Sequence, residues 1–254
     1  MFKKKKSLGQ NFLKSKSVVS HIVSASKIKK GDFILEVGPG QGFLTEDLLK
    51  SSKNVLCIEK DGRLIDVLNE KFAEQIKNND LEIFHDDILD FDLSIVYKDY
   101  KVIANIPYYI TGQIIKKFLT AKNKPSLMTV MVQKEVSQRI VAKDNKESVL
   151  SLSVKLFGEP IYVKTVKKNL FSPAPKVDSA ILLIDKIKES PFEKKEQEVL
   201  FFEIVKKAFN SKRKKVGTTL KSYEVELKRA HIDTNKRPED LRIEEWINLI
   251  KLIY

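Results

Sequence analysis

The sequence FILEVGPGQGFLT, residues 33–45, decides the fold of this chain. Residues 33–37 form an apolar run that is typical of a buried strand. Three glycines then alternate along residues 38–42, and an amphipathic segment with helical spacing follows them. A strand, a glycine-rich turn and a helix in this order are typical of α/β proteins that bring bare backbone close to a nucleotide-like ligand. Glycine suits such a turn because it lacks a Cβ atom and adopts positive φ.

The spacing of the glycines separates two kinds of ligand. The dinucleotide pattern G-x-G-x-x-G would place its third glycine at position 43, where the chain has Phe43. The pattern present is G-x-G-x-G, with Glu36 in the preceding strand, and it resembles the first motif of S-adenosylmethionine-dependent methyltransferases. An ordinary glycine turn without a ligand is the alternative, which a lone glycine pattern does not exclude.

The composition limits the possible partners. The chain has 254 residues, which is long enough for one large domain and one small domain. Its 47 Lys and Arg against 34 Asp and Glu give a net charge of +13, which suggests a polyanionic partner such as nucleic acid or an anionic membrane surface. Lysine is spread along the whole chain, so a generally lysine-rich composition is the alternative.

Metal, disulfide and membrane chemistry are not expected. The single cysteine, Cys57, excludes an internal disulfide and a multi-cysteine zinc site, and its apolar neighbours indicate a buried thiol. The three histidines lie far apart without ligand spacing. No segment approaches the ~20 apolar residues of a membrane span, and no apolar signal core follows the basic residues 1–6. The sequence therefore predicts a soluble, cytoplasmic protein without a metal.

Acidic residues follow the next two predicted strands. Glu59 comes directly after the predicted strand 54–58, about 20 residues past the glycines, where Rossmann-type folds use an acidic residue to bind ribose hydroxyls. Asp87 belongs to the acidic turn after the third predicted strand, 81–84, and a carboxylate there can accept the exocyclic amine of adenine. A surface acid at a strand end is the alternative for Glu59.

A fourth predicted strand, 100–104, leads into the sequence Asn105-Ile106-Pro107-Tyr108. This sequence resembles the [DNS]-P-P-[YFW] loop of methyltransferases that act on amino groups. The adenine N6 amine is a poor nucleophile, because its lone pair is delocalised into the ring. The Asn105 side-chain oxygen and the Ile106 carbonyl would accept its N–H groups, and Tyr108 would offer a stacking face on a loop that Pro107 stiffens. The alternative is a turn proline between a strand-ending asparagine and a packed tyrosine.

The second half of the chain adds an aromatic residue and a basic cluster. Phe171 begins FSPAPKVDS, residues 171–179, whose prolines would stiffen the loop and hold the ring out of the core for base stacking. A ring tucked under the sheet fits the sequence equally well. From residue 196 the pattern is helical, and it contains a basic cluster suited to RNA phosphates: Lys212, Arg213, Lys214 and Lys215. A solvated charged face is the alternative.

Together these motifs resemble one family, the ribosomal RNA adenine N6-dimethyltransferases, and within it the branch that acts on the small subunit. The resemblance covers nearly the whole chain. Its motifs are GQNFL at 9–13, EVGPG at 36–40, Glu59, Asp87, NIPY at 105–108, QKEV at 133–136, FSPAPKVDS at 171–179 and AFN at 208–210 before the basic cluster. Asp87 fits the family's register better than Asp86 does, because DILDFD at 87–92 matches the pattern that starts with this acid.

The resemblance implies a Rossmann-like class I methyltransferase domain of the α/β class over residues 1–187 and a small helical domain that binds RNA or the ribosome over 188–254. It implies that Tyr108 and Phe171 sandwich the target adenine beside Asn105. It also implies that the N-terminal segment closes over S-adenosylmethionine. The implied cofactor contacts are Asn11, Leu13, Gly38, Gly40, Glu59, Asp87 and Asn105.

The implied reaction dimethylates N6 of two adjacent adenosines in the 3′-terminal hairpin loop of small-subunit (16S) rRNA. A monomer is expected to act on this rRNA in a pre-ribosomal particle. Three other functions remain open: a large-subunit rRNA adenine dimethyltransferase of the macrolide-resistance type, a DNA adenine methyltransferase, and a ribosome-assembly factor in which methylation is secondary. The cluster at 208–215 favours the small-subunit branch, and the short helical tail is smaller than a usual DNA-recognition domain.

Overall fold

A computed structural model describes residues 10–211 and 213–254, and the chain divides into two compact units. The first unit comprises residues 1–137 and 159–187, and the second comprises residues 138–158 and 188–254. The first unit contains the predicted α/β sheet, and the second contains helices only among its described residues.

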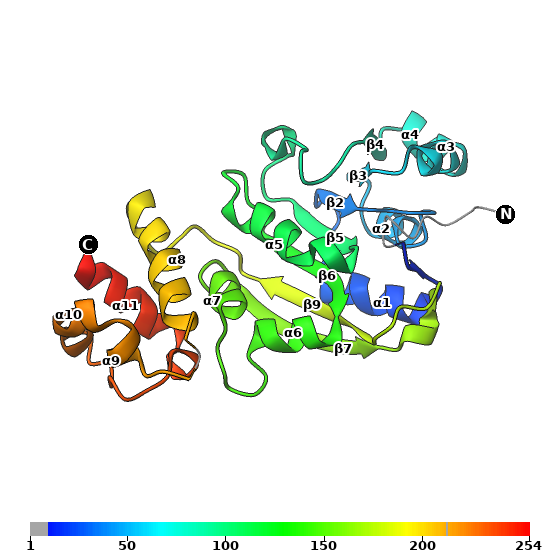
Figure 1. The fold of residues 1–254 in the computed structure, drawn as a ribbon. Helices are drawn as coiled ribbons and strands as arrows, with labels where there is room; N and C mark the ends of the chain where they lie inside the picture. Colours follow the sequence, from blue (N-terminus) through cyan, green and yellow to red (C-terminus); the bar gives the residue numbers. More distant parts are fainter. Residues whose placement is uncertain (1–9, 212) are drawn as a thin grey trace. The chain divides into compact units, whose positions relative to one another are not determined.

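The first unit is built on a seven-stranded sheet with the order β4-β3-β2-β5-β6-β9-β7 (Figure 1). The first five strands of that order are parallel, whereas β9 runs antiparallel to both β6 and β7. The strands are β2 (Ile34–Val37), β3 (Val55–Glu59), β4 (Leu81–His85), β5 (Lys101–Asn105), β6 (Leu127–Gln133), β7 (Glu159–Val166) and β9 (Ser179–Asp185).

The order of the strands determines where a ligand can bind. From β2 the chain proceeds outward through β3 to β4, and it then returns to place β5 on the other side of β2. In open α/β sheets, a ligand site forms at this switch point, beyond the carboxyl ends of the strands. The central strands are mostly apolar because both of their faces are buried, and all four residues of β2, Glu36 among them, are buried.

Helices follow β2, β3, β5 and β6, whereas a 3₁₀ turn lies between β4 and β5. Those that begin in the first unit are α1 (Lys16–Ala25), α2 (Thr45–Ser51), α3 (Gly62–Lys71), α4 (Ala73–Lys77), α5 (Thr111–Thr120) and α6 (Lys134–Val141), with the 3₁₀ turns η2 (Leu93–Ile95), η3 (Tyr108–Ile110) and η4 (Lys168–Leu170). Asp61 caps α3 by accepting from the Arg63 N–H. Cys57 is fully buried in the core, as predicted.

A second, two-stranded sheet pairs β1 (Phe12–Leu13) with β8 (Phe171–Ser172) in antiparallel register. Leu13 lies opposite Phe171, and the Lys14 N–H donates to the Leu170 carbonyl at 2.9 Å. The N-terminal segment is therefore fixed against the segment that begins the FSPAPKVDS motif.

The second unit packs its helices around one fully buried tryptophan, Trp246. The Phe209 ring lies 6.4 Å from the Trp246 ring, between centroids, and joins the two longest helices of the unit. Its elements are α7 (Val149–Lys155), α8 (Lys195–Phe209), α9 (Val216–Thr219), η5 (Lys221–Tyr223), α10 (Glu224–Arg229), η6 (Pro238–Asp240) and α11 (Ile243–Ile253). Across the described part of the chain, none of the helices has the length and apolar character to cross a membrane.

Candidate active site

A pocket of about 510 Å³ opens at the carboxyl ends of the parallel strands, at the switch point between β2 and β5. The structure brings ten of the residues singled out from the sequence into its lining. They are Asn11, Leu13, Gly38, Gly40, Glu59, Asp87, Asn105, Ile106, Pro107 and Tyr108. They converge because parallel strands present their carboxyl ends at the same edge of a sheet.

The glycine turn forms one wall of this pocket. Gly38, Gly40 and Gly42 have φ values of +69°, +62° and +73°, a region that residues with a Cβ atom rarely adopt. A Cβ atom at Gly42 would lie 2.4 Å from the Phe72 ring, whereas one at Gly38 would meet no protein atom within 4 Å. Gly42 is therefore required for packing, and Gly38 leaves bare backbone facing the open space.

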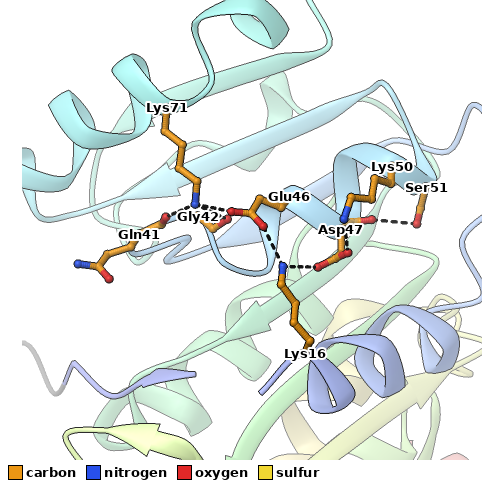
Figure 2. A network of polar contacts seen from close by, with 8 residues as sticks. All are labelled: Lys16, Gln41, Gly42, Glu46, Asp47, Lys50, Ser51 and Lys71. Carbon is orange, nitrogen blue, oxygen red and sulfur yellow. Dashed lines mark hydrogen bonds and ion pairs between the residues drawn. The ribbon is translucent and has the colours of Figure 1, made fainter. Parts of the chain in front are cut away.

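Figure 2 shows the ion pairs around α2 that hold this turn in place. Lys71, at the end of α3, lies 2.6 Å from Glu46 and donates to the Gln41 carbonyl of the turn at 2.9 Å. Lys16 of α1 lies 2.8 Å from Glu46 and 3.1 Å from Asp47. The Lys16 hydrogen bond, followed by that of Lys71, lowers the pKa of Glu46. Two helices are thus tied to the turn through shared charges on α2.

Glu59 connects the ends of β2 and β3. Its Oε2 accepts the Gly40 N–H at 3.1 Å and its Oε1 accepts the Asp61 N–H at 2.8 Å. Only 6% of the residue is exposed, and burial raises the pKa of its carboxyl against the effect of these hydrogen bonds. Each oxygen retains a second acceptor position, so the carboxylate can receive two neighbouring ligand hydroxyls.

Asp61 fixes the N-terminal segment at the pocket. It accepts a hydrogen bond from Gln10 Nε2 at 2.9 Å and pairs with the guanidinium of Arg63. The Arg63 hydrogen bonds, with support from Gln10, lower the pKa of the Asp61 carboxyl to about 2. The sequence argument missed this role of Asp61, although its position before Gly62 is a recognisable helix-cap signal.

Asp87 lines the pocket just after β4, beside the end of β3. Its Oδ1 accepts the Leu89 N–H at 3.0 Å, and its Oδ2 pairs with Lys60. Burial opposes ionisation here, but the Lys60 ammonium and the Leu89 amide together lower the pKa of Asp87. A charged acceptor therefore borders the pocket at the position expected to recognise an adenine amine. Lys60 was not anticipated, because nothing in a linear pattern pairs residue 60 with residue 87.

Asn105 stands at the end of β5, between the N-terminal segment and the pocket. Its Nδ2 donates to the Asn11 carbonyl at 3.1 Å, which leaves Oδ1 as the group that can accept from a ligand. The next carbonyl, that of Ile106, receives no hydrogen bond from any described residue. Two acceptors, one from a side chain and one from the backbone, are thus available side by side ahead of Pro107.

The Tyr108 ring is anchored at its hydroxyl, which hydrogen-bonds Ser179 at the start of β9. Burial raises the pKa of this hydroxyl, so the ring presents a neutral phenol at all physiological pH values. The anchor holds the Tyr108 ring at the pocket wall.

Phe171 does not stand out of the core, and the expectation that its prolines would hold it there is wrong. The residue is 2% exposed and belongs to the main hydrophobic core, and Ser172 rather than Phe171 lines the pocket. The physical reason is the pairing of β1 with β8, which places Leu13 opposite Phe171. The alternative of a tucked ring is the conformation that the structure has.

The basic cluster lies in the second unit, beyond α8. Arg213, Lys214 and Lys215 are exposed, and Lys215 donates to the Asn235 side chain at 2.8 Å. Lys212, the remaining member of the predicted cluster, lies outside the described residues. The three described cations carry charge that no acidic partner within salt-bridge distance offsets among the residues described.

The pocket residues suit S-adenosylmethionine. The volume lies within the range of about 300–1,000 Å³ that is usual for small-molecule sites. Glu59 offers acceptors for ribose hydroxyls, Asp87 offers one for the adenine amine, and Gly38 permits close approach to the backbone. Within the described ranges, no group of His, Cys, Asp and Glu side chains could hold a metal ion.

A switch-point pocket with a glycine turn and acidic strand ends defines a Rossmann-like nucleotide-binding fold, and the G-x-G-x-G spacing of its turn is that of class I methyltransferases. Comparison with known proteins gives the family. A model described as "Ribosomal RNA adenine dimethylase" matches residues 1–254, and this chain belongs to that family.

Named relatives agree with this assignment. The chain is 40% identical over 262 residues to "Ribosomal RNA small subunit methyltransferase A" of Fusobacterium nucleatum, covering 99% of this chain and 98% of the relative. Among solved structures, the 23S rRNA methyltransferase ErmE is 25% identical with a TM-score of 0.79, covering 95% of this chain and 99% of that one. A dimethyladenosine transferase from Plasmodium falciparum is 27% identical with a TM-score of 0.79, covering 94% and 95%.

Proposed function

We propose that this protein dimethylates N6 of two adjacent adenosines in the 3′-terminal hairpin loop of small-subunit (16S) rRNA, with S-adenosylmethionine as the methyl donor. The observation that carries the proposal is the pair of free acceptors, Asn105 Oδ1 and the Ile106 carbonyl, at the rim of a pocket suited to the donor. Family membership and a relative named for the small subunit support it.

The residues at the rim act on the adenine amine. Asn105 Oδ1 and the Ile106 carbonyl accept its two N–H groups, which takes the amine out of conjugation with the ring and directs the localised nitrogen lone pair towards the pocket. Tyr108 stacks on the base, which must first leave its own stack in the RNA loop. The bound donor supplies an already activated methyl group on its sulfonium. These residues therefore orient the amine, and one proton leaves the nitrogen for each methyl that it gains.

Dimethylation requires that the site accept a base that already carries one methyl. We propose that the first methyl group occupies the space beside Asn105, between this residue and Tyr108 in the pocket lining. A purified enzyme that yields only monomethyladenosine after long incubation with excess donor would contradict this part of the proposal.

Phe171 is the second aromatic residue in the proposed sandwich around the adenine. Its ring is buried beneath the N-terminal segment, so stacking on a base requires β1 to separate from β8. Asn11 and Leu13 belong to the N-terminal segment that contains β1, and we propose that they contact the donor. Donor binding and RNA binding would then both change the contacts of this segment.

The helical residues 188–254 are proposed to dock on RNA or on a pre-ribosomal particle through the basic cluster. Clustered cations give salt-dependent affinity without base recognition. Arg213, Lys214 and Lys215 are exposed as this role requires, and Lys212 completes the cluster in the sequence. A ribosomal substrate places the activity in the cytoplasm, where we expect the protein to act as a monomer.

A large-subunit target is the one alternative that a specific observation favours, because ErmE has the same fold at a TM-score of 0.79. Sequence identity supports the small-subunit target, because it is 25% to ErmE and 40% to the small-subunit relative. The test uses radiolabelled donor with unmethylated small subunits, large subunits and duplex DNA in parallel. Label in small-subunit RNA alone is expected, label in large-subunit RNA supports the alternative, and label in neither rejects both.

A further inference from the structure

The pocket contains a buried acid that the proposed reaction does not use. Glu36 lies in the centre of β2 and is only 1% exposed. Its Oε2 accepts the Thr45 hydroxyl at 2.6 Å and lies 3.5 Å from the Cys57 sulfur. Its Oε1 has no hydrogen-bond partner among the described residues, and Glu36 is part of the pocket lining. One oxygen is therefore held by the protein, and the other is left for the pocket.

The surroundings of Glu36 leave its charge poorly stabilised. β3 contributes Glu59 and Cys57, α3 contributes Lys71, and β5 offers only the apolar Ile103 opposite it. Burial raises the pKa of the Glu36 carboxyl to about 7, with a smaller increase from Glu59, while hydrogen bonds from Thr45 and Cys57 and the charge of Lys71 act in the other direction. Near neutral pH, a modest change of charge in the pocket is enough to move this group between its two forms.

The two ligands that alternate in a methyltransferase pocket differ by one charge. S-adenosylmethionine carries a sulfonium in addition to its ammonium and carboxylate, whereas the product S-adenosylhomocysteine has a neutral thioether. We propose that Glu36 senses this difference. Its carboxyl gives its proton to solvent when the positively charged donor binds and recovers a proton from solvent once the neutral product is left. The inference rests on the proposed donor and adds a charge-selective element to its site.

Linkage gives the direction of the effect. A ligand that requires the ionised carboxyl must drive the proton off below the pKa, so it binds more weakly at lower pH. The neutral product makes no such demand. The preference of the pocket for donor over product is thus expected to be greatest on the alkaline side of neutrality and to diminish as the pH falls, so that product inhibition increases on acidification.

Calorimetry on the intact protein tests this directly. With a free-state pKa of about 7 and full ionisation in the donor complex, donor affinity should rise about tenfold from pH 6 to pH 8. Product affinity should change little. At pH 7, titrations in buffers of different ionisation enthalpy should detect about half a proton more released by the donor than by the product.

Two variants sharpen the result. Glu36→Gln can still accept a hydrogen bond from the Thr45 hydroxyl but cannot ionise, so its affinities for donor and product should depend on pH in the same way. The ligand's own amine titrates equally in wild type and variant, so its contribution cancels when the two proteins are compared. Glu82→Gln, an exposed acid on β4, is the matched control and should behave as wild type.

The wild-type comparison of donor with product does not depend on how well a variant folds. Equal proton release by the two ligands overturns the inference, as does an unchanged donor profile in Glu36→Gln. Failure of both ligands to bind the wild type would overturn the proposed function instead, so the two failures can be told apart.

Discussion

Replacing each of three glycines by alanine should separate the packing role of the glycine turn from its ligand-binding role. Gly42 has φ +73°, and a Cβ atom there would lie 2.4 Å from Cε2 and 2.8 Å from Cζ of Phe72, which is 4% exposed. Gly38 has φ +69° but no protein atom within 4 Å of a Cβ atom. Gly112, in α5, has neither a positive φ nor a neighbour within 4 Å.

These environments give three different free energies of unfolding. A left-handed alanine costs about 1–2 kcal/mol, and forcing a methyl into a packed core costs about 1–3 kcal/mol more. Alanine recovers about 0.4–1 kcal/mol by restricting the unfolded chain. Gly42→Ala should therefore lose about 3 kcal/mol and Gly38→Ala about 1 kcal/mol, whereas Gly112→Ala should gain about 0.5–1 kcal/mol at a helical position.

Urea unfolding followed by circular dichroism measures stability, and calorimetric titration with S-adenosylhomocysteine measures binding. Gly38→Ala should lose about fivefold or more in affinity, about 1–3 kcal/mol, because its methyl occupies ligand space. Gly112→Ala should bind as wild type. Equal destabilisation by Gly38→Ala and Gly42→Ala, or unchanged binding by Gly38→Ala, would refute this account of the turn.

Three further predictions concern other parts of the molecule. Tyr108→Ala should weaken RNA binding by about 1–3 kcal/mol through lost stacking, while Tyr108→Phe should retain it, and fluorescence anisotropy with a loop oligonucleotide distinguishes them. Asp61 has a pKa lowered to about 2, so its contribution to stability is complete above about pH 4 and is lost as the pH falls towards 2. The free energy of unfolding of Asp61→Asn should therefore depend less on pH in this window than that of the wild type. Parallel curves of unfolding free energy against pH would exclude the pairing with Arg63 and Gln10. Replacing Arg213 and Lys214 by Gln should reduce the slope of log affinity against log salt by about 1 for each cation removed, as measured by filter binding, whereas an unchanged slope would indicate a solvated face.

The sheet and most of the pocket could be predicted because local patterns determine them. Apolar runs give the strands, and the glycine spacing places the turn that follows β2. Parallel strands end at a common edge, so Glu59, Asp87 and Asn105 were expected to meet although nearly 50 residues separate the first from the last. None of these placements required knowledge of a specific side-chain contact.

The remainder depends on contacts between distant segments. β1 and β8 are two residues long and about 160 residues apart, so no periodicity reveals their pairing. That pairing buries Phe171 and could not be read from the prolines beside it. The pairing of Lys60 with Asp87 has the same origin, because the sequence specifies each side chain but not the distance between them. Glu36 was recognised as part of the glycine motif, but its raised pKa was not anticipated, since an acid within an apolar strand acquires this property only from the neighbours that burial gives it.

The central claim is that Asn105 orients an adenine amine of small-subunit rRNA for methyl transfer. The most direct measurement incubates unmethylated small subunits with donor and either wild type or Asn105→Ala, digests the rRNA and determines nucleosides by mass spectrometry, with subunit binding measured in parallel. Wild type should produce N6,N6-dimethyladenosine, and the variant should be slower by about 10²–10³-fold, as for loss of one oriented hydrogen-bonding group in an active site, with unchanged subunit binding. Full activity in the variant would contradict the claim, and so would the absence of dimethyladenosine in the wild-type reaction.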